Sequence, residues 1–362
     1  MKNTLKFGAA TAVAALALTA CGAAPEAESG TQSGSGQSGA AAGSIKACMV
    51  SDSGGFDDKS FNQSGHEGME RAKSELGIEV DYAESQQDGD FTPNIQNMVQ
   101  GGCDVIFGVG FLMADAMNAA AKANPDVKFA LVDSTFADAP ENSKALVFNT
   151  AEAAYLAGYA SAGMTQTGTV GTYLGMQIPS TAVFADGYAD GIAKYNEANG
   201  TAVKLLGWDK AAQTGMATGD FTDTSKGKQF TAQLIEQGAD IVMPVAGPVG
   251  EGTLAAAKES GKTSVVWVDA DGFETQPDFG SLILTSVMKE IGQSVFDTVK
   301  TVQDGSWTHD DYIGTIANGG VGIAPFHDFD SKVPAELKSQ LTDLESQIKD
   351  GTIKVESSNS PS

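Results

Sequence analysis

The chain has 362 residues and carries 46 acidic against 22 basic side chains, which gives a formal net charge of −24 at pH 7. No cluster of Lys or Arg interrupts this acidity, so nucleic acid and anionic lipid headgroups are poor partners. The length exceeds that of one ordinary domain and indicates two lobes.

The N-terminal residues have the pattern of an export signal. Lys2 and Lys6 precede an apolar run that ends in small residues. The run is too short to cross a bilayer as a helix, which takes about 20 apolar residues. Leu18-Thr19-Ala20-Cys21 resembles the bacterial lipobox, in which the signal is cut before the cysteine and lipid is attached to its thiol. We expect residues 1–20 to be a lipoprotein signal peptide; the alternative is a plain signal with a chance cysteine.

The segment that follows indicates a tether. Residues 21–44 consist mainly of Gly, Ala, Ser and Gln and contain no aromatic side chain, a composition typical of a flexible linker. We expect diacylglycerol and palmitate on Cys21 to anchor the protein on the extracytoplasmic face of the cell membrane. Lipid is then the only expected membrane attachment. We expect the folded body to start at Ile45 and residues 356–362 to form a tail. We expect the protein to be a monomer.

From Ile45 onward, short apolar runs alternate with amphipathic runs of helical period, the pattern of βαβ units and parallel sheets. The expected strands are 45–50, 78–82, 105–109, 127–132 and 146–148, then 170–174, 203–206, 241–245, 265–268 and 282–287. The expected helices include 60–76, 112–123, 151–164, 226–237 and 250–260, and Leu337, Leu341, Leu344 and Ile348 define a last helical face. We therefore predict an α/β fold with two doubly wound parallel-sheet lobes.

Ligands of such sheets bind beyond the carboxyl ends of the strands. Asp52 ends the first strand, and Ser60 followed by Gln63 matches a capping box that starts the next helix at Ser60. Phe61 and Asn62 then lie in the first helical turn, facing the crevice. An aromatic ring beside an amide and a carboxylate suits a planar ligand with polar edges, although Phe61 could instead belong to the core.

The other strand ends add glycines and carboxylates at the same edge. Asp133 follows one strand, Gly247 follows another, and Asp269-Ala270-Asp271 follows a third. Glycine lets the backbone approach a ligand, and a carboxylate can accept hydrogen bonds from vicinal hydroxyls. Each residue alone could be a turn or a helix cap, but together they predict a ligand site.

The sequence contains no convincing catalytic group. Gly247–Thr253 has the glycine spacing of a phosphate-binding loop but lacks its lysine, and the three histidines lack the spacing of metal ligands. No Gly-x-Ser-x-Gly motif surrounds a serine. We expect a binding protein with no enzymatic activity, no cofactor and no metal.

The loop from Asp52 to Gln63, with the sequence DSGGFDDKSFNQ, resembles the signature of the basic membrane protein family, which comprises purine-nucleoside-binding lipoproteins of ABC importers. Shorter matches are 106–111, 187–191, 238–241, 268–271 and 285–289, and the resemblance extends from about Ile45 to Val355. It implies a type I periplasmic-binding-protein fold whose lobes close on the ligand by a hinge motion. The implied lobes are 45–149 with about 273–310, and 150–272 with about 311–355.

The resemblance also implies a set of ligand contacts. A nucleobase would be clamped between Phe61 and Phe221, with Asp52 and Asn62 at its polar edge. The residues similar to the ribose-binding set are Gly247, Lys289 and one of Asp269 and Asp271, of which we favour Asp271. The implied partners are a nucleoside and an ABC permease.

Three other functions are compatible with parts of the sequence. A receptor for a sugar or a signalling molecule would share the fold, but a sugar site would be expected to contain more Trp and charged residues. An exported hydrolase would need a nucleophile and a base. A purely structural surface lipoprotein would bind no ligand.

Two cysteines follow Cys21. Cys48 lies within the first predicted strand and Cys103 sits just ahead of Val105 at the opening of the third, and these strands are neighbours in a 2-1-3 order. A disulfide between them is possible if their Cα atoms lie within about 4.4–6.8 Å. Because adjacent parallel strands rarely offer that geometry, we expect two buried thiols.

Overall fold

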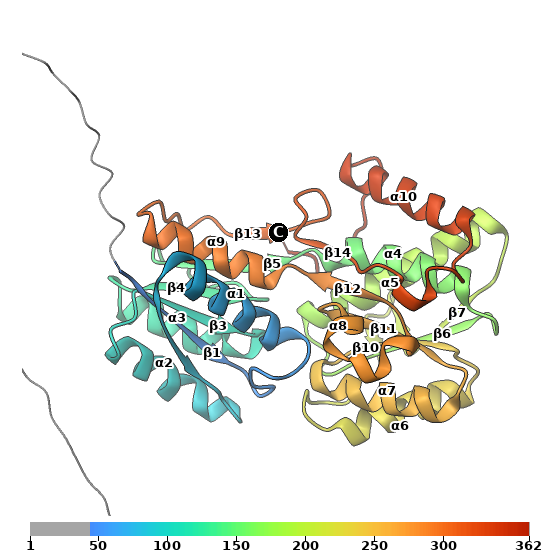
Figure 1. Cartoon of the computed structure of the whole chain (residues 1–362), viewed down its shortest axis with the longest axis horizontal. Helices are drawn as coiled ribbons and strands as arrows, with labels where there is room; N and C mark the ends of the chain where they lie inside the picture. Colours follow the sequence, from blue (N-terminus) through green and yellow to red (C-terminus); the bar gives the residue numbers. More distant parts are fainter. Residues whose placement is uncertain (1–43, 362) are drawn as a thin grey trace, which may run out of the picture. The chain divides into compact units, whose positions relative to one another are not determined.

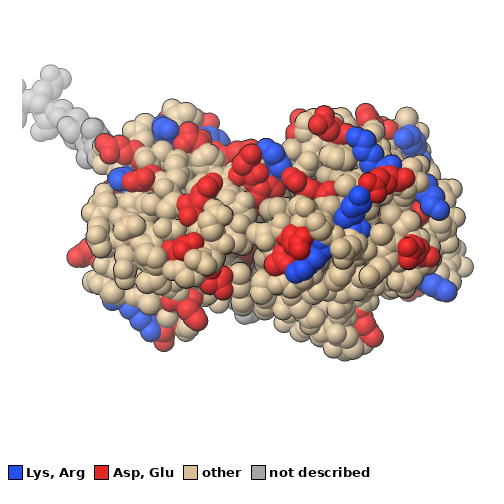
Figure 2. Space-filling model, turned by 90° about the horizontal axis from the view of Figure 1, so that it is seen from below, with Lys and Arg blue, Asp and Glu red and all other residues tan. Residues whose placement is uncertain are grey.

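The computed structural model describes residues 44–361 (Figure 1). The expected signal peptide, nearly all of the linker and the expected lipidation site Cys21 lie outside the described residues. Within these residues, no helix is both long enough and apolar enough to cross a membrane. On the face shown in Figure 2, acidic and basic side chains are interspersed rather than gathered into a basic patch.

Two six-stranded sheets form the body, and each is the centre of one lobe. The sheet of lobe 1 has the order β13-β5-β4-β3-β1-β2, and all its strands are parallel. Its strands are β1 (Lys46–Ser51), β2 (Glu79–Ala83), β3 (Val105–Val109), β4 (Lys128–Val132), β5 (Ser143–Phe148) and β13 (Tyr312–Gly314). The predicted 2-1-3 order of the first three strands is therefore confirmed.

The sheet of lobe 2 has the order β14-β12-β11-β10-β6-β7, and its only antiparallel pair is β12 with β14. Its strands are β6 (Thr169–Leu174), β7 (Lys204–Leu206), β10 (Ile241–Val245), β11 (Ser264–Asp269), β12 (Ile283–Lys289) and β14 (Val321–Ile323). The short strands β8 (Trp208–Asp209) and β9 (Thr214–Gly215) form a separate hairpin. The predicted α/β class with two parallel-sheet lobes is confirmed.

Helices cover the sheets. They are α1 (Phe61–Leu76), α2 (Phe91–Gln100), α3 (Ala114–Ala123), α4 (Thr150–Met164), α5 (Pro179–Asn199), α6 (Thr224–Glu236), α7 (Gly250–Ser260), α8 (Gly272–Thr275), α9 (Ile291–Gln303) and α10 (Ala335–Lys349). The 3₁₀ turns are η1 (Asp88–Asp90), η2 (Phe111–Met113), η3 (Gly247–Val249), η4 (Pro277–Leu282) and η5 (His327–Phe329). The predicted apolar face of α10 is buried, as its periodicity indicates.

The chain crosses between the lobes after β5, after β12 and after β13. We expected about 273–310 in lobe 1, but β12 belongs to lobe 2 because it pairs with β11, with Val287 opposite Val268. We expected 311–355 in lobe 2, but β13 extends the sheet of lobe 1 by pairing with β5. Helix α9 also lies within the segment 273–310, and it packs against α1 of lobe 1 as we expected.

Helices α4 and α5 are in backbone contact in lobe 2. A Cβ atom on Gly158 would lie 2.2 Å from the carbonyl oxygen of Tyr188, and one on Gly191 would lie 1.9 Å from that of Tyr155. Real side chains do not approach so closely. The Gly187-Tyr188-x-x-Gly191 motif therefore serves helix packing.

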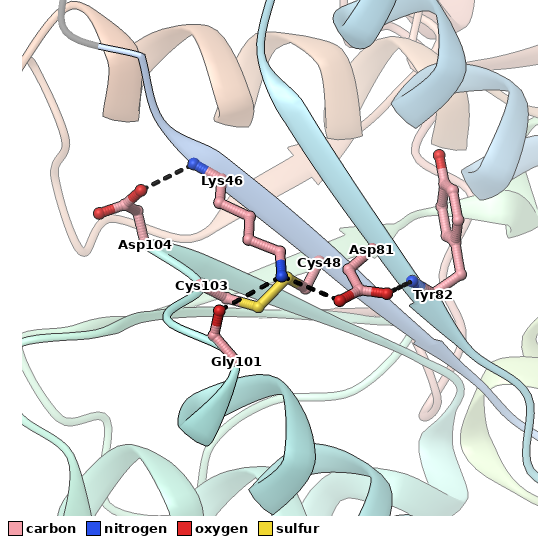
Figure 3. The surroundings of a disulfide bond; sticks show 7 residues. All are labelled: Lys46, Cys48, Asp81, Tyr82, Gly101, Cys103 and Asp104. Atoms are coloured by element: carbon pink, nitrogen blue, oxygen red, sulfur yellow. Dashed lines mark hydrogen bonds and ion pairs between the residues drawn. A yellow bond between two sulfur atoms is a disulfide. The ribbon is translucent and has the colours of Figure 1, made fainter.

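Cys48 and Cys103 form a disulfide with a Cα–Cα distance of 6.0 Å, so the expectation of two free thiols is wrong (Figure 3). Cys103 does not lie in β3 but in the turn before it, three residues ahead of Ile106, the strand partner of Cys48. Reciprocal bonds hold this turn beside β1: Lys46 N donates to Asp104 Oδ2 and Asp104 N donates to Lys46 O. The pair thus avoids the unfavourable geometry of two adjacent strand positions.

Candidate ligand-binding site

A cavity lies where the carboxyl ends of both sheets face each other, with about 560 Å³ of atom-free space, part of it open to solvent. It is lined by all the ligand-binding residues expected from the sequence except Asp271, namely Asp52, Phe61, Asn62, Asp133, Phe221, Gly247 and Lys289. Lobe 1 supplies Asp52, Phe61, Asn62 and Asp133, lobe 2 supplies Phe221 and Gly247, and Lys289 ends β12 at a crossing. The cavity is therefore shared by the two lobes.

The start of α1 is fixed by Asp58, not by the expected capping box. The Asp58 carboxylate accepts hydrogen bonds from the backbone N–H groups of Ser60, Asn62 and Gln63, all between 2.8 and 3.0 Å. These are donors that a helix start leaves unsatisfied. Ser60 makes no side-chain capping bond. Helix α1 begins at Phe61, so Phe61 and Asn62 occupy its first turn, as predicted.

Asn62 holds the Asp52 carboxylate in place. Its Nδ2 donates to Asp52 Oδ1 at 2.8 Å and to Asp58 Oδ2 at 3.0 Å, which uses both amide hydrogens. Its Oδ1 accepts from the Asp52 backbone N–H at 3.4 Å. Since Asp52 Oδ1 also accepts from Gly54 N, Asp52 Oδ2 is the oxygen left to meet a ligand. Asn62 therefore orients the Asp52 carboxylate and also lines the cavity itself.

Gly110 leaves room for that carboxylate. Its φ of 121° is one that only glycine adopts readily, and a Cβ there would lie 2.4 Å from Asp52 Oδ2. Burial raises the pKa of Asp52 to about 6, while the Asn62 hydrogen bond opposes that shift. The cavity lining thus includes a carboxyl group with a pKa near neutral pH.

Aromatic rings line the cavity from both lobes. Phe61 is half-buried at the start of α1, and Phe221 is half-buried in the loop before α6. The Phe221 ring lies against Gly175, where an added Cβ would be 2.4 Å from the ring. Phe184 of α5, which the sequence interpretation missed, adds a fully buried ring. Two half-exposed rings from opposite lobes can enclose a flat ligand.

A buried ion-pair group forms another part of the lining. The Lys289 Nζ contacts Asp133 Oδ2 and lies 3.3 Å from Asp269 Oδ1. The three side chains are 3%, 8% and 9% exposed respectively. Burial lowers the pKa of Lys289, but the two carboxylates outweigh burial and hold the pKa above its usual value. The ammonium therefore stays charged and can donate to a ligand hydroxyl, while its carboxylate partners can accept from one.

The position of Asp271 does not match the role we favoured for it. Asp271 caps α8 by accepting from Phe273 N at 3.0 Å, and its other oxygen lies 2.7 Å from His327 Nε2. Asp269, not Asp271, lines the cavity and contacts Lys289. Of these two aspartates, Asp269 therefore belongs to the cavity lining and Asp271 does not.

Direct hydrogen bonds join the lobes beside the cavity. Ser60 Oγ donates toward Asp269 Oδ2 at 3.0 Å and Val268 O at 3.1 Å, and Trp267 Nε1 donates to Lys59 O at 3.3 Å. The loop that carries the start of α1 is thus fastened to the end of β11. The two lobes are therefore in direct contact beside the cavity.

Several residues of the lining were not expected from the sequence. They are Leu112, Ile178, Ser180, Thr181 and Phe184. Ile178, Ser180 and Thr181 surround the start of α5, where Pro179 marks a helix N-terminus and could have drawn attention to the preceding strand end. Among the described residues, no group of three or more His, Cys, Asp or Glu is arranged to hold a metal ion.

Two α/β lobes that share an aromatic and polar cavity are the arrangement expected of a solute-binding protein. A family model described as ABC transporter substrate-binding protein PnrA-like (Bmp) matches residues 45–359. The chain belongs to this family, as the resemblance of the Asp52–Gln63 loop predicted.

Individual relatives agree with the family. The chain is 33% identical to the ABC transporter nucleoside-binding protein BmpA of Lactococcus lactis subsp. cremoris, covering 89% of this chain and 92% of that protein. It is also 33% identical to a lipoprotein of Pyrococcus abyssi, over 84% of this chain and 76% of the relative. Among solved structures, an ABC transporter solute-binding protein of Aeropyrum pernix superposes with a TM-score of 0.78 at 25% identity, over 86% of this chain and 92% of that one. The type I periplasmic-binding fold is therefore confirmed.

Proposed function

We propose that the protein captures purine nucleosides outside the cytoplasmic membrane and delivers them to an ABC permease. The observation that carries the proposal is the pairing of Phe61 and Phe221, half-buried rings on opposite lobes that line one cavity. A nucleobase can stack on such rings whatever hydrogen-bonding groups its edge carries, and stacking contributes about 1–3 kcal/mol per base. Lobe closure brings the two rings together on the base.

The polar groups fit the two ends of a nucleoside. At one end, the free oxygen of Asp52 can accept from an N–H on the base edge. At the other, Asp133, Asp269 and Lys289 offer carboxylates and an ammonium to the ribose hydroxyls. This division of groups favours a nucleoside over a free base or a free sugar, each of which would fill only part of the lining.

The relatives support the same ligand class and cellular location. The Lactococcus relative is named a nucleoside-binding protein, and the Pyrococcus relative is named a lipoprotein. With the lipobox-like Leu18–Cys21, these names favour a lipid-anchored protein on the extracytoplasmic face. Replacing Cys21 with Ser should abolish incorporation of labelled palmitate; equal labelling of both chains would contradict lipidation.

Calorimetric titration with a panel of ligands tests the nucleoside proposal. The panel contains adenosine, guanosine, inosine, cytidine, uridine, adenine and ribose. We expect the purine nucleosides to bind most tightly, and a ligand at a hundredfold excess over Kd should stabilise the protein by about 2.7 kcal/mol. Tight binding of ribose alone would instead indicate a sugar receptor, release of free base during titration would indicate a hydrolase, and no binding would contradict the proposal.

A further inference from the structure

A second cavity adjoins the ligand-binding cavity. The two share Phe111, Asp133 and Ser180 in their linings, and we call these three residues the neck. The second cavity has about 730 Å³ of atom-free space, part of it open to solvent. The rest of its lining is Ser134, Thr135, Val147 and Phe148 of lobe 1, Pro179 and Val183 of α5, and Ser358 to Pro361. We call it the outer compartment.

The C-terminal residues form a fixed wall of the outer compartment. The fully buried carboxylate of Asp186 accepts from Ser357 Oγ at 2.6 Å and from Asn359 Nδ2 at 3.1 Å. Ser360 Oγ donates to Asn149 Oδ1 at 2.9 Å, at the crossing between β5 and α4. Because a buried charge and a crossing residue both hold this segment, the wall is part of the folded body.

The outer compartment is uncharged apart from its neck. Its lining offers hydroxyls of Ser and Thr, one Asn side chain and apolar groups, and it contains no Lys or Arg. Its single ionisable side chain, Asp133, is already paired with Lys289. An anionic group placed there would lose hydration without gaining a counter-charge and would face the Asp133 carboxylate. An uncharged polar or apolar group meets no such penalty.

We propose that the outer compartment receives an uncharged substituent on the sugar of a bound nucleoside, and that it excludes a 5′-phosphate. The orientation follows from the neck, because Asp133 belongs to the Lys289 group that suits the ribose hydroxyls. The sugar therefore faces the outer compartment, while the base faces Asp52. This inference rests on the proposed nucleoside function and extends its substrate class to nucleosides modified on the sugar.

Titration with matched ligands tests the inference. The ligands are adenosine and guanosine, their 5′-deoxy-5′-methylthio derivatives and their 5′-monophosphates. We expect each methylthio derivative to bind within about tenfold of its parent and each monophosphate to bind at least a hundredfold more weakly. The inference fails, and the nucleoside function stands, if the parent nucleosides bind but the methylthio derivatives bind as weakly as the monophosphates. It fails in the same way if the monophosphates bind as tightly as the parent nucleosides. If neither parent binds, the proposed function itself fails.

Substitutions in the lining test whether the substituent on the sugar lies in the outer compartment. Ser134 and Thr135 line only the outer compartment, so Ser134→Trp or Thr135→Trp should leave the affinity for the parent nucleoside within about threefold and weaken the methylthio derivative at least tenfold. Ala137→Trp, exposed on the same loop and in neither lining, is the matched control and should change neither affinity. Equal losses for parent and derivative in folded Ser134 and Thr135 variants would overturn the assignment. Thr135 is exposed, which makes its variant the safer test of the two.

Discussion

The hydroxyl of Ser60, on lobe 1, donates to the carboxylate of Asp269, on lobe 2, across a distance of 3.0 Å. The same hydroxyl lies 3.1 Å from the carbonyl oxygen of Val268. Asp269 also contacts Lys289 in the cavity lining. One side chain therefore connects the start of α1, the far lobe and the ion pairs that line the cavity.

Replacing Ser60 with Ala should weaken ligand binding more than it weakens the fold. The variant loses one hydrogen bond between the lobes, which contributes about 0.5–1.5 kcal/mol, so Kd should rise by roughly two- to twelvefold. The start of α1 should be unaffected, because the Ser60 side chain does not cap it. Calorimetry and urea unfolding of the same variant measure the two effects.

Asp58→Ala is the matched control for Ser60→Ala, because it removes the helix cap on the same loop. It should lower the free energy of unfolding by about 1–2 kcal/mol or more, as loss of an N-cap does. If Ser60→Ala destabilised the ligand-free protein as much as Asp58→Ala, the role of Ser60 in lobe closure would be wrong.

Phe61→Ala should cost binding rather than folding. Loss of a stacked ring should weaken nucleoside binding by about 1–3 kcal/mol. Phe184, which lines the same cavity but is fully buried, provides the contrast: Phe184→Ala should cost about 3–5 kcal/mol of folding stability. Affinity and urea unfolding should be measured for both variants. A Phe61 variant with unchanged affinity and a large loss of stability would place Phe61 in the core.

The Asp52 carboxyl should make the ligand-free protein less stable as the pH rises. Its pKa of about 6 in the folded chain exceeds the ordinary value of 3.8, so the folded state binds the proton more tightly. The free energy of unfolding should therefore fall between about pH 4 and pH 6 and remain lower above pH 6, by at most about 3 kcal/mol. Asp52→Asn should remove this dependence, which urea unfolding at a series of pH values measures.

Binding provides the control for the Asp52 variant. The ionised carboxylate can only accept hydrogen bonds, so it favours guanosine and inosine, whose N1–H is a donor. Asp52→Asn should weaken these ligands at pH 7.5 although it stabilises the ligand-free protein. A variant with unchanged affinity and unchanged pH dependence would show that Asp52 neither meets the base nor titrates near pH 6.

Lys289→Met should destabilise the fold even without ligand. It leaves the carboxylates of Asp133 and Asp269 buried without their cation, and breaking a buried ion pair typically costs about 3–5 kcal/mol. Adding Asp133→Asn to the same chain should recover part of that loss, because one uncompensated charge is removed. Urea unfolding of the single and double variants decides this, and additive losses would argue against a coupled group.

The Cys48–Cys103 disulfide should be detectable by thiol counting. In denaturant without reductant, a chain carrying Cys21→Ser should show no titratable thiol, and it should show two after reduction. Reduction should lower the free energy of unfolding by about 2–4 kcal/mol. The Cys48→Ala/Cys103→Ala double variant should be insensitive to reductant; two thiols without reduction would contradict the bond.

The strand positions and the parallel-sheet fold were predictable, because short continuous apolar runs between helical patterns are typical of buried parallel strands. The lobe crossings were not predictable, because the apolar run of β12 could belong to either sheet. Its pairing with β11 determines that it belongs to lobe 2. The disulfide was missed although Gly101-Gly102 precedes Cys103 and signals a turn; Gly102 indeed has a φ of 76°. A turn placed there would have shown that Cys103 is not bound by the geometry of two adjacent strand positions.

The site was largely predictable from residues at strand ends, but local patterns misled in two places. Ser60-x-x-Gln63 matches a capping box, yet the Ser60 hydroxyl is directed to the other lobe by a contact 209 residues away along the chain. Asp271 and Glu274 have the spacing of an N-cap and its partner, which could have assigned Asp271 to α8. Phe184 gave no signal, since it lies in a continuous run of buried residues, Thr181–Tyr188, in which no helical period marks one face.

The three crossings determine how this protein can be dissected. Neither lobe is a continuous stretch of chain, so no single cut yields an intact lobe. A fragment ending at Asn149 would lack β13, the neighbour of β5, and α9, the helix packed on α1. Its uncovered strand edge and helix face would favour aggregation over folding. Half-sized pieces are therefore unsuitable for isolating the contribution of each lobe, and point variants in the whole chain are required.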